Sequence, residues 1–209
     1  MKLKAQPSNM DYYHYLINKS WFRRLIRKFY LKDIARHLHG KHLDVGCGAG
    51  ELLEVYPASF GSDLNPMLVK YCHDSGHPAV IADCTALPFV SCSFDSLTMS
   101  NLLEHLEHPL IALKEAARLL KEGGVMVVTV PFEAGFKFDP THITFLEADQ
   151  LKDLTGRAGL IFERLYSFPF GGKLLGKFLY FIELRAVLRK QDKPTKDADL
   201  AQLNTGSVQ

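Results

Sequence analysis

Residues His42 to Leu53 read HLDVGCGAGELL, a short apolar run followed by three glycines at alternate positions, Gly46, Gly48 and Gly50. Glycine is used where φ must be positive, or where a ligand lies so close to the backbone that a Cβ would clash with it. A single glycine would suffice for a tight turn without a ligand. The stretch therefore predicts a strand, a ligand-binding turn and then a helix.

Strand and helix patterns alternate after this turn. Short apolar runs that predict strands lie at 42–45, 59–64, 78–83, 93–100 and 125–130. Helices are predicted at 51–56, 66–75 and 107–121. The second of these helices has Asn65 as its N-cap and Pro66 in its first turn. Alternation with short connections favours a doubly wound, mostly parallel α/β sheet.

The two ends of the chain have different patterns. Residues 21–38 predict an amphipathic, basic helix ahead of the first strand. After the fifth strand, residues 145–160 predict a helix and 161–168 a strand, while 181–190 fit either a last strand or a helix. The polar stretch 191–209 has little periodicity, so we expect it to be disordered.

Composition narrows the class of protein. The chain has 209 residues, of which 47% are hydrophobic, enough for one sizeable core. Its formal net charge of +2 gives no reason to expect DNA binding. The four cysteines form no C-x-x-C pair, so we expect reduced thiols in a cytoplasmic protein, without a disulfide framework or a metal site. No apolar run approaches the ~20 residues of a transmembrane helix, and residues 1–20 do not resemble a secretory signal.

The glycine spacing discriminates between nucleotide ligands. In the dinucleotide fingerprint G-x-G-x-x-G the third glycine would fall at Glu51, beside which a pyrophosphate is disfavoured. The Gly-Lys-Ser/Thr of a phosphate-binding loop is missing as well. Asp63 and Asp83 close the second and third predicted strands, where their carboxylates can accept ribose hydroxyls and an adenine amine. These features favour a nucleoside without phosphates and count against a nicotinamide-dependent oxidoreductase.

Five motifs occur in order between His42 and Pro131: LDVGCGAG, GSDLNPMLV, IADCTALPF, FDSLTMSNLLEHL and LLKEGGVMVVTVP. In these motifs the chain resembles the class I S-adenosylmethionine-dependent methyltransferases, in the group called methyltransferase type 11. The resemblance implies a Rossmann-like, seven-stranded sheet. It also implies an N-terminal helical cap over residues 1–40, a methyltransferase domain over 41–190 and a tail over 191–209.

Carried onto matching positions, the resemblance implies where S-adenosylmethionine binds. Asp44 and the glycine turn would surround its methionine part, Asp63 would hold the ribose, and Leu64 would flank the adenine. Asp83 and the Cys84 backbone would read the adenine edge. The full set of implied cofactor positions is Asp44, Gly46, Cys47, Gly48, Gly50, Asp63, Leu64, Asp83, Cys84, Asn101 and Leu102. The last two would line the cavity beside the methyl sulfonium.

Methyl transfer requires alignment of the reacting atoms and, for many acceptors, a base that removes a proton. We favour His142, in the loop after the fifth strand, with His105 of NLLEHLEHP as a second candidate and Asn101 as a pocket residue. Holding that loop by hydrogen bonds is an equally good role for His142. The stretch around His105 also resembles ubiquinone-biosynthesis O-methyltransferases, in which acids and a His engage a metal or the substrate. Because Asn101 stands where they have a further acid, we expect no metal.

The segment MDYYHYLINKSWFRRLIRKFY, residues 10–30, combines many aromatic side chains with a basic face. Our first interpretation is that the aromatic residues pack on the core as a helical cap over the cofactor. A membrane-surface helix and an RNA-contacting face are the alternatives.

The resulting hypothesis is methyl transfer from S-adenosylmethionine to a small-molecule acceptor, for which aromatic and lipid-like molecules are candidates. The Asn/Asp-Pro-Pro-Tyr/Phe motif typical of amine methylation is replaced by SNLLEH, which favours oxygen or carbon as the acceptor atom. One alternative is a methyltransferase-like protein that binds the cofactor without catalysis. Another is a methyltransferase that acts on tRNA.

Overall fold

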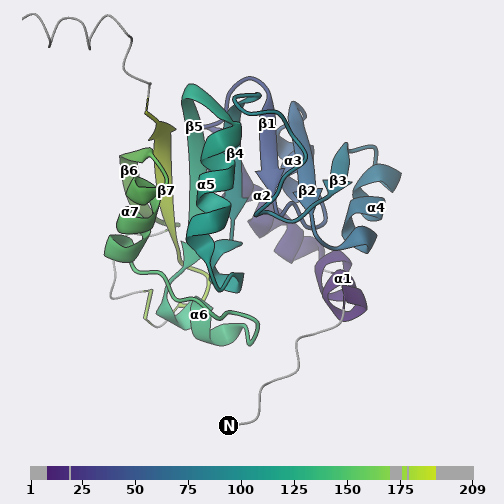
Figure 1. Cartoon of the computed structure of the whole chain (residues 1–209). Coiled ribbons are helices and arrows are strands. Elements are labelled where there is room, and N and C mark those ends of the chain that lie inside the picture. Colours follow the sequence, from purple (N-terminus) through teal and green to yellow (C-terminus); the bar gives the residue numbers. More distant parts are fainter. Residues whose placement is uncertain (1–8, 19, 170–175, 178, 192–209) are drawn as a thin grey trace, which may run out of the picture.

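The computed structural model describes residues 9–18, 20–169, 176–177 and 179–191, which form one seven-stranded sheet with helices on both sides (Figure 1). The strands are β1 His42–Val45, β2 Ser59–Asp63, β3 Ala79–Ile81, β4 Phe94–Ser100, β5 Leu120–Pro131, β6 Leu160–Phe168 and β7 Glu183–Lys190. Their order across the sheet is β3-β2-β1-β4-β5-β7-β6. β1 to β5 are parallel, and β7 runs antiparallel between β5 and β6. The predicted fold class is confirmed.

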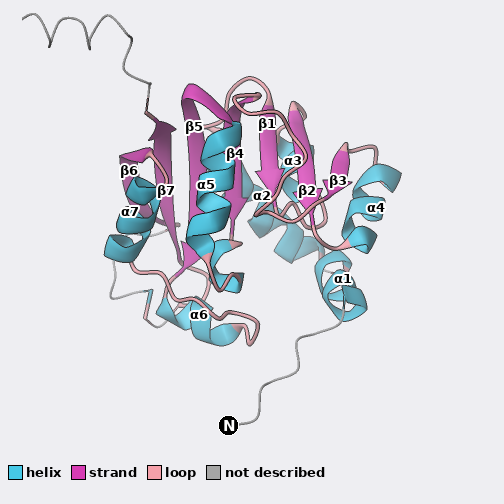
Figure 2. Cartoon of the chain, in the orientation of Figure 1, coloured by secondary structure: helices cyan, strands magenta, loops and turns pink. Residues whose placement is uncertain are grey.

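The helices are α1 Asn9–Ile17, α2 Trp21–Ala35, α3 Glu51–Val55, α4 Pro66–Asp74, α5 Pro109–Leu119, α6 Glu133–Phe138 and α7 Ala148–Arg157, with a 3-10 turn η1 at Leu103–His105. Figure 2 shows α5 and α7 in front of the sheet and α2 and α3 behind it. Successive side chains of β5 pack against the helices on opposite faces of the sheet, because side chains alternate along a strand. Val128 packs with Leu113 of α5, whereas Val127 packs with Leu31 and Ile34 of α2.

The strand order places the glycine turn where a ligand is expected. From β1 the chain moves outward to β2 and β3 and then returns to β4 on the other side of β1. The crevice at such a reversal lies at the carboxyl ends of the strands. The turn after β1, Asp63 at the end of β2 and Asn101 after β4 all lie at this edge. In Figure 1, α6 and α1 lie beyond the same edge.

Two predicted boundaries are wrong, and one open assignment is decided. The third strand ends at Ile81, two residues before Asp83, so Asp83 lies in the loop rather than on the strand. The helix predicted over 107–121 spans Pro109–Leu119, because Leu120 already pairs with Phe94 as the start of β5. The segment 181–190, for which strand and helix were both open, contains strand β7. Its neighbours β5 and β6 satisfy its backbone on both sides.

The aromatic residues of the N-terminal segment do not all pack on the core. In α2, Tyr30 is buried together with Leu31 and Ile34, but Trp21, Phe22 and Phe29 are exposed. That part of the first interpretation is therefore wrong. None of the helices in the described ranges has the length and hydropathy of a bilayer-spanning segment. Of the predicted tail 191–209, only residue 191 belongs to the described part of the chain, and the division into cap, domain and tail stays a prediction.

Candidate functional site

The turn between β1 and α3 is bent sharply over the end of β2. The backbone N–H groups of Gly46 and Cys47 both donate to the carbonyl oxygen of Ser62, at 2.8 and 2.9 Å. Gly46 and Gly48 have φ values of 76° and 54°, in the left-handed region that other residues adopt at a cost. The turn thus leaves bare backbone facing the crevice.

Asp63 fixes the outer half of the turn. Its Oδ2 accepts from the Gly48 N–H at 2.9 Å and its Oδ1 accepts from the Asn65 N–H at 2.9 Å. Burial raises the pKa of the Asp63 carboxyl, and these two backbone donors oppose the rise. A carboxylate offers about four acceptor positions, so these backbone donors leave capacity for a ligand hydroxyl. This position suits the ribose contact expected of Asp63.

Asp44 lies beneath the turn at the end of a buried hydrogen-bond chain. The Thr98 hydroxyl donates to Asp44 Oδ1 at 2.7 Å, and His42 Nε2 lies 3.0 Å from that hydroxyl oxygen. On its other side His42 Nδ1 lies 3.1 Å from Ser96 Oγ, whose hydroxyl donates to the His39 carbonyl at 2.8 Å. Burial raises the pKa of Asp44 to about 6 and lowers the pKa of His42 to about 3.

The number of protons available in this hydrogen-bond chain follows from its side chains. Each hydroxyl has one proton, and a neutral imidazole has one N–H. With Asp44 ionised, Thr98 donates to it, and the single N–H of neutral His42 serves only one of its contacts with Ser96 and Thr98. A protonated Asp44 would instead donate to Thr98 and leave the Thr98 proton for His42. Ionisation of Asp44 therefore leaves one contact of His42 without a proton. The charge of Asp44, beneath the glycine turn, should therefore depend on pH.

A cavity of about 990 Å³ opens beside the turn, at the upper end of the size range of ligand sites. Its floor includes Gly46, Cys47, Gly48 and Asn101. Its walls come from α2, the loop after β4, α6 with the following loop, and the segment before β7. The wall residues that matter below are Phe22, Ile26, Arg27, Phe29, Tyr30, Glu104, His105, Phe138, His142, Tyr180, Phe181 and Glu183.

Asn101 has a conformation that few residues adopt. Its φ is 52°, and such strain outside glycine is concentrated at functional sites. The backbone N–H of Asn101 donates to the Thr129 carbonyl at 3.0 Å, and its side-chain Nδ2 donates to Glu183 Oε2 at 3.3 Å. The amide is thereby fixed at the cavity floor.

Arg185 joins three parts of the cavity wall. This fully buried side chain donates from Nε to Glu183 Oε1 at 2.8 Å and from Nη1 to Asp33 Oδ2 at 2.6 Å. Nη1 also reaches the Tyr30 carbonyl at 3.1 Å, and the guanidinium carbon lies 3.8 Å from the centre of the Phe168 ring. Two carboxylates thus compensate one buried cation. The network attaches α2 to β7 and, through Glu183, to Asn101.

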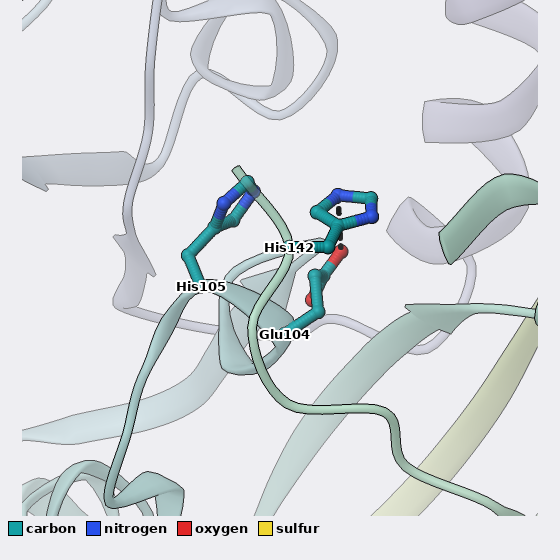
Figure 3. A group of neighbouring side chains, drawn as sticks. All are labelled: Glu104, His105 and His142. Atoms are coloured by element: carbon teal, nitrogen blue, oxygen red, sulfur yellow. Dashed lines mark ion pairs between the residues drawn. The ribbon is translucent and has the colours of Figure 1, made fainter. Parts of the chain in front are cut away.

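Glu104, His105 and His142 lie close together at the cavity wall (Figure 3). Their potential ligand atoms all lie within 4.8 Å of one another, and Glu104 Oε1 is 3.9 Å from His142 Nε2. Glu104 is buried, and within the described residues neither carboxyl oxygen has a hydrogen-bond partner. Burial raises the pKa of Glu104 to about 8, so the carboxyl is mostly protonated at neutral pH.

Hydrogen bonds define the tautomers of the two histidines. His142 Nδ1 lies 3.0 Å from the Phe136 carbonyl, which can only accept, so this nitrogen bears the proton. His105 Nδ1 lies 3.1 Å from Thr141 Oγ1, whose own proton is donated to Asp139 at 2.7 Å, so His105 donates as well. Both Nε2 atoms are left with a lone pair. The neutral cluster therefore offers two basic nitrogens beside a protonated carboxyl.

The loop that bears His142 is tied to the Glu104 backbone. The Ile143 and Thr144 N–H groups donate to the Glu104 carbonyl at 2.8 and 3.0 Å. The ring of His142 stacks on Phe136, with centroids 5.5 Å apart. His142 is thus held from both sides, with its Nε2 still facing Glu104. Both roles considered for His142, base and loop support, are compatible with this geometry.

Leu64, Asp83 and Cys84, which were predicted to contact the nucleoside half, do not line the cavity. Leu64 is exposed next to Asp63, and Asp83 is exposed and accepts from the Thr85 N–H and hydroxyl at 2.8 and 2.7 Å. Cys84 is partly buried against the core. The side chain of Leu102 packs under Gly46, 3.1 Å from where a Cβ would be. These assignments stay predictions.

Sequence reasoning missed Glu183, Arg185 and Tyr30. All three depend on a contact between α2 and β7, more than 150 residues apart in the chain, which no local pattern encodes. Glu183 and Arg185, the two charged residues within the otherwise apolar stretch 181–188, were the available signal, since charges inside a central strand have to be paired.

Comparison with known proteins shows which proteins this chain resembles. Residues 43–128 match the family model of the methyltransferase domain. The chain is 32% identical over 149 residues to the ubiquinone/menaquinone biosynthesis C-methyltransferase UbiE of Geobacter sp. (strain M21). This match covers 63% of this chain and 61% of that protein. It is 34% identical over 93 residues to a tRNA (carboxymethyluridine(34)-5-O)-methyltransferase of Arabidopsis thaliana, which covers 42% of this chain and 23% of that protein.

Among solved structures, a SAM-dependent methyltransferase from Archaeoglobus fulgidus superposes with a TM-score of 0.69. The match covers 85% of this chain and all of that one, at 22% sequence identity, and so concerns the fold. Residues 43–128 therefore match the methyltransferase domain family, and the chain has the fold of solved SAM-dependent methyltransferases.

Proposed function

We propose that this protein transfers a methyl group from S-adenosylmethionine to a small apolar acceptor, at an oxygen or carbon atom. The observation that carries the proposal is the cavity of about 990 Å³, which joins the glycine turn to the Glu104, His105 and His142 cluster. The cavity has room for an acceptor beside the reactive end of the cofactor. Its rim is rich in aromatic and aliphatic side chains, which fit an apolar molecule.

The residues at the turn fit the cofactor chemically. Backbone without side chains at Gly46 and Gly48 permits close approach, and Asp44 and Asp63 offer carboxylates to a ligand with a sulfonium and an ammonium group. Arg27 lies between Glu51, 3.6 Å from its Nε, and Ser100, 3.3 Å from its Nη2. We assign it to the carboxylate of the methionine part. When bound, S-adenosylmethionine supplies an electrophilic methyl group.

The protein's part in the reaction is alignment and proton removal. As the bond between the acceptor atom and the methyl carbon forms and the carbon–sulfur bond breaks, the acceptor's proton passes to His142 Nε2. The Nδ1–H of His142 stays bonded to the Phe136 carbonyl. The imidazolium lies 3.9 Å from Glu104 Oε1, and its charge favours ionisation of that carboxyl. Asn101, fixed by Glu183, borders the reacting atoms.

Two measurements test the proposal. Calorimetric titration with S-adenosylhomocysteine reports cofactor binding, and release of labelled methyl onto a panel of phenols, quinols, lipids and tRNA reports the acceptor class. Binding without transfer to any acceptor would support the non-catalytic alternative, and transfer to tRNA alone would favour the RNA alternative that the Arabidopsis relative suggests.

His142→Gln tests the base. General-base catalysis contributes ~10²–10⁴-fold, so the rate should fall by that factor while S-adenosylhomocysteine binds as before. His108→Gln, at an exposed histidine nearby, is the matched control and should keep its rate. If His142→Gln keeps its rate too, His142 supports the loop and a different group accepts the proton.

A further inference from the structure

The first two turns of α2 expose a continuous set of large apolar side chains. Trp21, Phe22, Leu25, Ile26 and Phe29 are 76%, 56%, 58%, 44% and 57% exposed, and we call them the α2 apolar face. Single exposed apolar residues are ordinary on protein surfaces, whereas contiguous ones mark an interaction surface. Among the residues that the structure describes, nothing buries the face, which leaves it open to a partner.

The face is turned away from the core. At ~100° per residue, its five side chains span an arc of about 140° around the helix axis. The buried residues Tyr30, Leu31 and Ile34 are centred on roughly the opposite direction. α2 therefore has two apolar sides, of which one attaches it to the sheet and the other meets solvent.

Cations border the face. α2 contains Arg23, Arg24, Arg27, Lys28 and Lys32 against a single acid, Asp33, which is paired with the buried Arg185 at 2.6 Å. Arg24, Lys28 and Lys32 follow one edge of the arc. Lys28 also lies 3.4 Å from Glu54 of α3, but this pair is half exposed and weak. Aromatic and aliphatic side chains beside a row of Lys and Arg are typical of helices that lie in a membrane interface.

The face continues into the candidate active site. Phe22, Ile26 and Phe29 belong both to the face and to the cavity wall. Phe138 of α6 and the Tyr180 and Phe181 pair, which are likewise exposed, border the same cavity. The ring of Phe138 stacks on Tyr180 with centroids 4.8 Å apart. One apolar rim therefore surrounds the cavity mouth and extends along α2.

We propose that the α2 apolar face docks the protein on an anionic lipid bilayer, with the cavity mouth toward the acyl chains. Charge complementarity favours this occupant, since the bordering cations match anionic headgroups. The exposed aromatic rings of the face could also stack on RNA bases, but the aliphatic Leu25 and Ile26 beside them offer no stacking surface and fit acyl chains better. Docking also gives the proposed apolar acceptor a path from the bilayer into the cavity, and this last step alone rests on the proposed function.

Trp21 is the only tryptophan of the chain, so its fluorescence reports on this face directly. The full chain is mixed with vesicles of equal parts phosphatidylcholine and phosphatidylglycerol, without cofactor. We expect co-sedimentation, a blue shift of the Trp21 emission, and weaker binding as salt is added. Leu25→Ser/Phe29→Ser removes two face residues and keeps the reporter, and it should lower vesicle affinity by at least ~10-fold.

Ile111→Ser/Ile161→Ser is the control variant, because it removes two similarly exposed apolar side chains elsewhere. It should bind vesicles as wild type does, and circular dichroism checks that both variants fold. Several outcomes overturn the proposal: no binding to the anionic vesicles, equal loss in both variants, a Trp21 shift with tRNA but not with lipid, or a dimer that Leu25→Ser/Phe29→Ser dissociates. Vesicle binding without methyl transfer to any acceptor would refute the proposed function and leave the docking intact.

Discussion

Replacing Glu104 by Gln should make the stability of this protein less sensitive to pH. The variant should be less stable than wild type below neutral pH and more stable than wild type above it. The folded-state pKa of about 8 exceeds the ordinary value of 4.5, because burial disfavours the charged form. A carboxyl with a raised pKa contributes its full stability below the unfolded pKa and loses it as pH rises toward the folded pKa. Wild type should therefore become less stable between pH 4.5 and 8.

The size of the effect follows from the shift. One pKa unit corresponds to ~1.4 kcal/mol, so the interval from 4.5 to about 8 sets a ceiling of about 5 kcal/mol. The Glu104→Gln substitution keeps the shape of the side chain without its charge, but the amide has two N–H donors where the protonated carboxyl has one O–H, and the additional unpartnered donor costs ~1–3 kcal/mol. The variant should thus be less stable than wild type near pH 5 and more stable by a few kcal/mol near pH 9.

Urea unfolding at a series of pH values, followed by circular dichroism, gives both curves. Asp44 and His42 also titrate, but they are present in both proteins, so the difference between the curves isolates Glu104. Parallel curves would show that the carboxyl is ionised in the folded protein, and the assignment of a protonated Glu104 beside His142 would be withdrawn.

Two further predictions concern the cavity wall and floor. Arg185→Gln should destabilise the fold by ~3–5 kcal/mol in urea unfolding, because Glu183 and Asp33 lose a buried partner. The control Arg189→Gln, at an exposed pair with Glu163, should cost under ~1 kcal/mol. Equal costs would contradict the buried Arg185 network. Burial raises the pKa of Asp44 to about 6, and the ammonium of S-adenosylhomocysteine prefers an ionised Asp44. Affinity for S-adenosylhomocysteine, measured by calorimetry, should therefore be higher at pH 8 than at pH 5, and Asp44→Asn should remove most of that difference. An equal difference in the variant would place the ammonium elsewhere.

The fold could be predicted because its determinants are local. Glycine spacing, the Asn65 and Pro66 helix start and short apolar runs each act within a few residues, and their alternation predicts the doubly wound, mostly parallel sheet. Asp83 was misplaced by two residues because the apolar run continues past the last strand pairing at Ile81. The last strand stayed open because a mixed run of charged and apolar residues fits both periods.

The sequence could bring candidate site residues together only where they belong to one segment. The turn and Asp63 come from adjacent stretches, whereas the burial of Glu104 depends on the loop that carries His142 and on how that loop packs. The α2 apolar face shows a different limit of pattern reading. Helical periodicity locates apolar arcs, but where a helix has two such arcs, only tertiary packing decides which one meets the sheet.

The central claim is that the cofactor lies on the bare backbone of the glycine turn, and Gly48→Ala tests it most directly. Gly48 and Gly76 both have left-handed φ values, 54° and 80°, and an added Cβ would meet only Leu16 at 3.4 Å in the first case and nothing within 4 Å in the second. Each substitution should therefore cost a similar ~1–2 kcal/mol of stability. In calorimetric titration with S-adenosylhomocysteine, we expect Gly76→Ala to bind as wild type and Gly48→Ala to lose at least ~10-fold in affinity, whereas equal affinity in the two variants would contradict binding at this turn.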